Sequence, residues 1–142
     1  MNQTRSLATV AIYFASLGIL LSGYLSYQTL FAPIGCSQAL ITCGGTPVEF
    51  FGIPQCVLGF IMFLAAAIVS ILILESMRPA PWLSIQLWLS LAGTLFAAGL
   101  SVYELWLRQP APTTMPSCVY GFFLYLGVLI ATILARRQEV RA

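Results

Sequence analysis

Four long apolar segments constrain the fold of this chain more than any other feature of its sequence. They cover residues 7–31, 53–74, 82–107 and 117–135, and each is close to or above the roughly 20 residues of helix that cross a bilayer. Only 7% of the residues are charged, whereas soluble domains carry about 25%. Because backbone groups inside a bilayer must pair within the chain, the sequence predicts an all-α membrane protein with four transmembrane helices in a single domain, residues 1–142.

The arginines predict which side of the membrane each loop faces. Short loops rich in arginine stay in the cytoplasm, and five of the six arginines lie at the termini or in the second loop: Arg5, Arg78, Arg136, Arg137 and Arg141. We therefore expect both termini in the cytoplasm and the loop at residues 32–52 on the extracytoplasmic side, where disulfides persist. The net charge of +2 follows from this orientation and indicates no nucleic-acid partner.

A short repeat relates the starts of the second and fourth apolar segments. GIPQCVLGFIMFL at residues 52–64 aligns without gaps with TMPSCVYGFFLYL at residues 114–126. The identical pairs are Pro54/Pro116, Cys56/Cys118, Val57/Val119, Gly59/Gly121, Phe60/Phe122 and Leu64/Leu126. The chain thus reads as two parallel helical hairpins, which implies a pseudo-twofold axis along the membrane normal. Such an axis predicts that Cys56 and Cys118 lie at equal depth on opposite sides of the bundle centre, where a bond between them is possible.

The outer loop, residues 32–52, holds the other two cysteines, Cys36 and Cys43. A straight helix would hold their sulfurs about 10 Å apart, whereas a disulfide needs α-carbons within about 7 Å. A bond between them therefore requires a bent segment, which the glycines and prolines on both sides allow. Apolar residues at positions 48, 50 and 51 indicate that the loop lies across the mouth of the bundle as a cap that shields a site from water.

Cysteine pairs at two levels form the arrangement that passes electrons by thiol–disulfide exchange. The loop pair would meet a soluble partner, and the pair at the helix N-termini would lie beside backbone N–H groups that favour a thiolate. In a membrane the natural two-electron acceptor is a quinone. Gln55 and Tyr120 flank the inner cysteines and can hydrogen-bond a quinone carbonyl; Tyr27 and Phe122 complete the predicted ring pocket.

Other interpretations of these residues stay open. A membrane cysteine often packs as a small hydrophobe, the loop pair can be a static staple, and Glu49 and Glu104 are most simply interfacial. The first alternative function is a non-catalytic, disulfide-stapled protein that binds lipid or quinone or assists assembly. The second is copper(I) handling by Cys56, Met115 and Cys118, which the absence of histidine disfavours, so we predict no metal site.

The order of features resembles the vitamin K epoxide reductase family and its bacterial and archaeal disulfide-forming homologues. A first helix is followed by C-S-x(5)-C at residues 36–43 and by G-I-P-x(4)-G-F at residues 52–60, and the resemblance covers nearly the whole chain. It implies a four-helix bundle around a quinone of the ubiquinone, menaquinone or vitamin K type. It also implies a thioredoxin-like extracytoplasmic partner and a location in a prokaryotic cytoplasmic membrane.

By the same resemblance, Cys36 and Cys43 are the shuttle pair, Cys118 is the second cysteine of the family's Cys-x-x-Cys, and Gln55 stands where the family has a quinone-binding Asn. One departure is plain, because Met115 occupies the position of the first cysteine and gives M-P-S-C. We hypothesise that Cys56 supplies the missing sulfur across the pseudo-twofold axis. The sequence therefore predicts a membrane enzyme that oxidises extracytoplasmic thiols and reduces a quinone.

Overall fold

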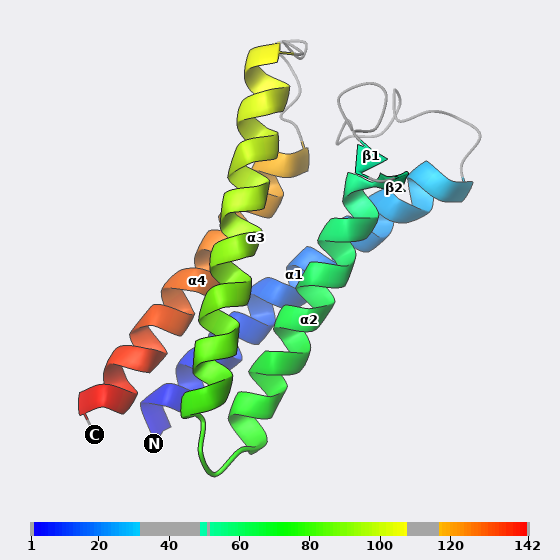
Figure 1. Cartoon of the computed structure of the whole chain (residues 1–142). Helices are drawn as coiled ribbons and strands as arrows, with labels where there is room; N and C mark the ends of the chain where they lie inside the picture. The colour runs from blue at the N-terminus through cyan, green and yellow to red at the C-terminus, as the bar shows by residue number, and fades with distance from the viewer. Residues whose placement is uncertain (1, 32–48, 51, 108–116, 142) are drawn as a thin grey trace.

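The computed structural model describes residues 2–31, 49–50, 52–107 and 117–141, and Figure 1 shows their arrangement. These residues form four helices, α1 (Asn2–Phe31), α2 (Gln55–Glu75), α3 (Ala80–Leu107) and α4 (Ser117–Arg141). All four are long and apolar enough to cross a membrane. The protein is an all-α four-helix membrane bundle, as the apolar segments predicted.

Two short strands precede α2. β1 (Glu49–Phe50) and β2 (Ile53–Pro54) pair antiparallel, and Gly52 between them has a φ of 77°, a conformation that glycine adopts without steric cost. The second helix consequently begins at Gln55 rather than at residue 53. Pro54 precedes it as the N-cap, so Cys56 lies in the first helical turn.

The helices extend beyond the apolar segments at the end of the bundle that carries both termini (Figure 1). α1 begins at Asn2 rather than at residue 7, and α4 continues to Arg141 rather than stopping at residue 135. The apolar segment of the sequence marks only the part of a helix that lies in hydrocarbon. The helix itself can continue into the aqueous interface, where the side chains of arginines reach water. Arginine also has a high helix propensity, which favours this extension.

Each helical hairpin is held together by an aromatic ring that packs on a glycine. Phe63 of α2 lies directly over Gly18 of α1, and Tyr125 of α4 lies directly over Gly93 of α3, so a β-carbon at either glycine would overlap the ring. The two rings then stack on each other with centroids 4.0 Å apart. Small residues permit this close approach of membrane helices, and the stacked pair joins the two hairpins at the centre of the bundle.

Substituting Gly93 with Ala should destabilise the bundle by about 1–3 kcal/mol, because the added methyl group must displace the Tyr125 ring. Gly99→Ala is the matched control on the same helix, since a β-carbon there has no atom within 4 Å. Thermal unfolding in detergent, followed by circular dichroism, measures both. Equal stability of the two variants would contradict the packing described for Tyr125.

Candidate functional site

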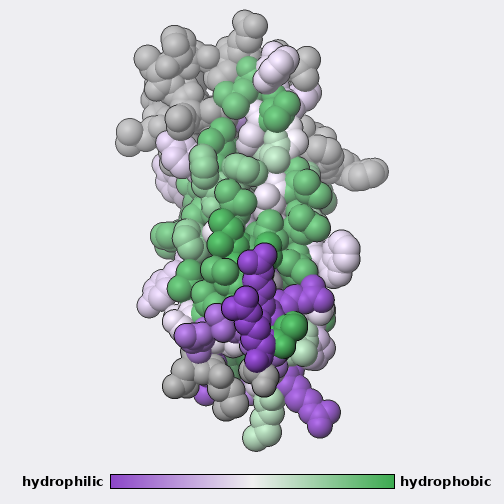
Figure 2. Space-filling view, turned by 90° about the vertical axis from the view of Figure 1, so that its left-hand side faces the viewer, coloured by the Kyte–Doolittle hydropathy of each residue, from purple (hydrophilic) through white to green (hydrophobic). Residues whose placement is uncertain are grey.

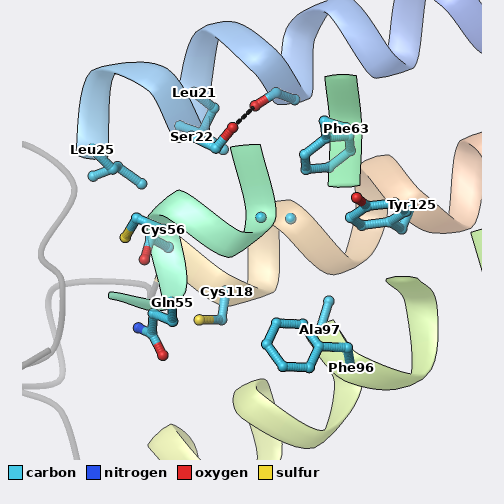
Figure 3. Close-up of a pocket in the computed structure, with 14 residues that line it drawn as sticks. Leu21, Ser22, Leu25, Gln55, Cys56, Phe63, Phe96, Ala97, Cys118 and Tyr125 are labelled. Atoms are coloured by element: carbon cyan, nitrogen blue, oxygen red, sulfur yellow. Dashed lines mark hydrogen bonds between the residues drawn. The ribbon is translucent and has the colours of Figure 1, made fainter. Parts of the chain in front are cut away.

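A cavity lies between the four helices (Figure 3). Its lining includes the starts of α2 and α4, which lie away from the chain termini (Figure 1). Its volume is about 70 Å³. We call it the cysteine cavity. Its walls are Gly18, Leu21, Ser22, Leu25, Gln55, Cys56, Gly59, Phe63, Phe96, Ala97, Ser117, Cys118, Gly121 and Tyr125.

The two hairpins contribute matching positions to this cavity. Each residue that α2 contributes has a counterpart from α4 in the register of the sequence repeat. The matching pairs are Gln55/Ser117, Cys56/Cys118, Gly59/Gly121 and Phe63/Tyr125. The repeat-related starts of α2 and α4 therefore face the same cavity, and both inner cysteines line it.

Both cysteines are in the first turns of their helices. Cys56 is buried, with 8% of its surface exposed, and packs against Leu25 and Leu21 of α1. Cys118 is half-buried at the start of α4, and Figure 3 shows its sulfur on the side of the cavity where Gln55 lies. Both positions lie at a helix N-terminus, and the positive end of the helix dipole stabilises negative charge.

Gln55 connects the cavity wall to a buried carboxyl group. Its side-chain nitrogen donates a hydrogen bond of 3.0 Å to Oε1 of Glu104 near the end of α3. Gln55 is 4% exposed and Glu104 only 1%. The side chain of Glu104, for which an interfacial position was the simplest interpretation, faces the interior of the bundle rather than water. Within the described residues, Gln55 Oε1 and Glu104 Oε2 have no hydrogen-bond partner.

Tyr125 is a polar residue of the cavity that sequence reasoning missed. Its ring is 2% exposed, and its hydroxyl group has no hydrogen-bond partner within the described residues. A buried tyrosine hydroxyl usually has a partner, so this one is available to a molecule in the cavity. The alignment of the repeat could have identified it, because Tyr125 is the counterpart of Phe63 in that alignment.

Three residues predicted to shape the ring pocket do not line the cysteine cavity. Tyr27 is 63% exposed and contacts Phe31 on α1, and Tyr120 is 43% exposed on α4. Phe122 is half-buried and packs against the cluster that contains Phe63 and Tyr125. The structure therefore brings Gln55 together with the inner cysteines but does not place Tyr27, Tyr120 or Phe122 in the same cavity wall. Tyr120 is two residues from Cys118 on α4, which turns it about 200° around the helix.

The loop cysteines Cys36 and Cys43 lie outside the described residues, and so does Met115. Their predicted roles as shuttle pair and as alternative metal ligand stay predictions. Among the residues that the structure does describe, no group of three or more histidine, cysteine, aspartate or glutamate side chains could hold a metal ion.

Comparison with models of known protein families finds none that matches the chain, and comparison with curated proteins finds no significant match. The site is therefore interpreted from its own geometry.

We expect the Gln55–Glu104 hydrogen bond to be visible as strong coupling in a double-mutant cycle. Gln55→Leu or Glu104→Leu alone leaves a buried polar group without this partner, which costs about 1–3 kcal/mol or more. The double variant should lose less stability than the sum of the two single variants, because neither polar group is then left behind. Unfolding in detergent measures the cycle; strictly additive losses would show that the two side chains do not interact.

Proposed function

We propose that the protein is a membrane thiol oxidoreductase that passes electrons from extracytoplasmic thiols to a membrane quinone, in the manner of the vitamin K epoxide reductase family. The observation that carries the proposal is the cysteine cavity itself. It brings Cys56 and Cys118 from the two hairpins to one apolar space that also contains Gln55 and the hydroxyl of Tyr125.

The proposed reaction balances with the inner cysteines as the electron donor. Oxidation of the Cys56 and Cys118 thiols to a disulfide releases two electrons and two protons, which convert a quinone to its quinol. Cys36 and Cys43, as a reduced pair, then restore the inner thiols by thiol–disulfide exchange, in which a thiolate attacks one sulfur and displaces the other. A thioredoxin-like dithiol protein reduces the loop pair in turn and leaves as a disulfide.

The polar groups of the cavity suit a quinone as the acceptor. A quinone has two carbonyl oxygens that accept hydrogen bonds, and the Tyr125 hydroxyl can donate one. The amide nitrogen of Gln55 carries two hydrogens, so it can donate to a carbonyl while it remains bonded to Glu104. Glu104 touches Gln55 and does not line the cavity, which makes it a positioning residue in this proposal.

The size of the cavity sets a condition on binding. Its volume of about 70 Å³ is roughly half of the about 150 Å³ of an engineered protein cavity that binds benzene. A quinone ring must therefore enter from the open mouth and displace wall side chains such as Leu21 or Leu25. This small volume is also the observation that favours the alternative, a non-catalytic protein in which the cysteines only pack.

Purified protein supplied with a reduced thioredoxin-like donor and a short-chain quinone should reduce the quinone. Cys118→Ala and Cys56→Ala should each abolish turnover, because each removes one sulfur of the inner pair. Cys36→Ser separates the enzyme from the alternative, since the enzyme loses turnover with this donor whereas a stapled binding protein loses only stability. Quinol formation is followed by absorbance. Undiminished quinone reduction by Cys118→Ala would rule out the proposed function.

Substitution of Tyr125 and of Tyr120, both on α4, shows which of the two side chains contacts the quinone. Tyr125→Phe should raise the KM for quinone about 2- to 10-fold, the usual effect of one lost hydrogen bond. Tyr120→Phe removes the same hydroxyl from an exposed position outside the cavity and should leave the KM unchanged. Steady-state kinetics with both variants decides; a raised KM for Tyr120→Phe alone would favour the sequence-based pocket over the cavity.

A further inference from the structure

A second cavity lies at the end of the bundle that carries the termini, between the first turns of α3 and the last turns of α4. Its volume is about 430 Å³. We call it the arginine cavity, because three of its residues are arginines. Its walls are Leu87, Ile133, Arg136, Arg137, Val140 and Arg141. None of these residues takes part in the cysteine cavity.

The residues from α4 recur at helical spacing on one face. Ile133, Arg137 and Arg141 follow one another at four-residue steps, so they lie one above another along the helix. Ile133 is the farthest of the three from the C-terminal end of α4, and Arg137 and Arg141 lie nearer to that end. Figure 2 views the side of the bundle on which α4 lies and shows a hydrophilic patch at the lower end of an otherwise apolar surface.

The charge of this cavity is strongly positive. Three arginines line it, whereas Glu139, the one acidic residue of α4, does not. The C-terminus of α4 carries partial negative charge, but α3 begins at the same end of the bundle with its partial positive charge. These helix-end charges offset each other, so the three guanidinium groups determine the sign of the site.

We propose that the arginine cavity binds the headgroup of an acidic phospholipid. Arginine pairs bidentately with phosphate oxygens, and the arginines lie where a membrane helix emerges from hydrocarbon into the headgroup region. Leu87 and Ile133 continue the same cavity toward the apolar surface, where they can contact the upper part of an acyl chain. Basic pockets between membrane helices are a known mode of binding for anionic headgroups.

Lipid binding to the purified full-length protein in detergent tests the proposal by native mass spectrometry. Phosphatidylglycerol should bind more tightly than phosphatidylcholine with the same acyl chains. The double variant Arg136→Gln/Arg137→Gln should weaken phosphatidylglycerol binding on the order of 30-fold. The matched control is Arg5→Gln/Arg78→Gln, which removes two exposed positive charges at the same end without altering the cavity and should leave binding nearly unchanged.

Three outcomes would overturn the proposal. Equal weakening by both double variants would show diffuse attraction to positive charge rather than a site. Equal binding of the two lipids to the unaltered protein would show that headgroup charge is not recognised. Inorganic phosphate that competes with phosphatidylglycerol at equal concentration would identify a site for free phosphate rather than lipid. Quinone reduction is not needed for any of these readouts, so the test is independent of the proposed function.

Discussion

The hydrogen bond between Gln55 and Glu104 is the interaction on which the site depends most. Carboxyl groups inside a membrane protein are costly and persist where they are paired or functional. Here the carboxyl near the end of α3 accepts a hydrogen bond from the first residue of α2. Because Cys56 directly follows Gln55, this bond also constrains the first turn of α2, on which that cysteine lies. The polar pair thus orients an otherwise apolar helix start.

The second organising feature is the sequence repeat, because the same contact between an aromatic ring and a glycine occurs in both hairpins. Phe63 on Gly18 and Tyr125 on Gly93 close the two hairpins in the same way, and the stacked rings then form the floor of the cysteine cavity. One difference between the halves matters for chemistry. The phenyl ring of Phe63 is replaced by a phenol in Tyr125, which adds one hydrogen-bonding group to an apolar space. A duplicated fold has therefore acquired an asymmetric site.

The four-helix fold and part of the candidate site could be predicted from the sequence. Long apolar runs define membrane helices, and the ungapped repeat placed Cys56, Cys118 and Gln55 at one level. Helix rotation could not be predicted, because a membrane helix is apolar on nearly every side and hydrophobic periodicity does not show which face is buried. For that reason Glu104 was expected in the interface and Tyr125 was missed. Tyr27 and Tyr120 were assigned to a pocket wall, whereas the structure leaves both exposed.

In the proposed reaction, one sulfur from each hairpin belongs to the electron-donating pair of the bundle. Peptide mapping by mass spectrometry, after incubation of the reduced protein with a short-chain quinone and alkylation of the remaining thiols, tests it most directly. Peptides containing Cys56 and Cys118 should be recovered joined by a disulfide after quinone treatment and separately alkylated before it. Two alkylated thiols at these positions in protein that has reduced quinone would contradict it.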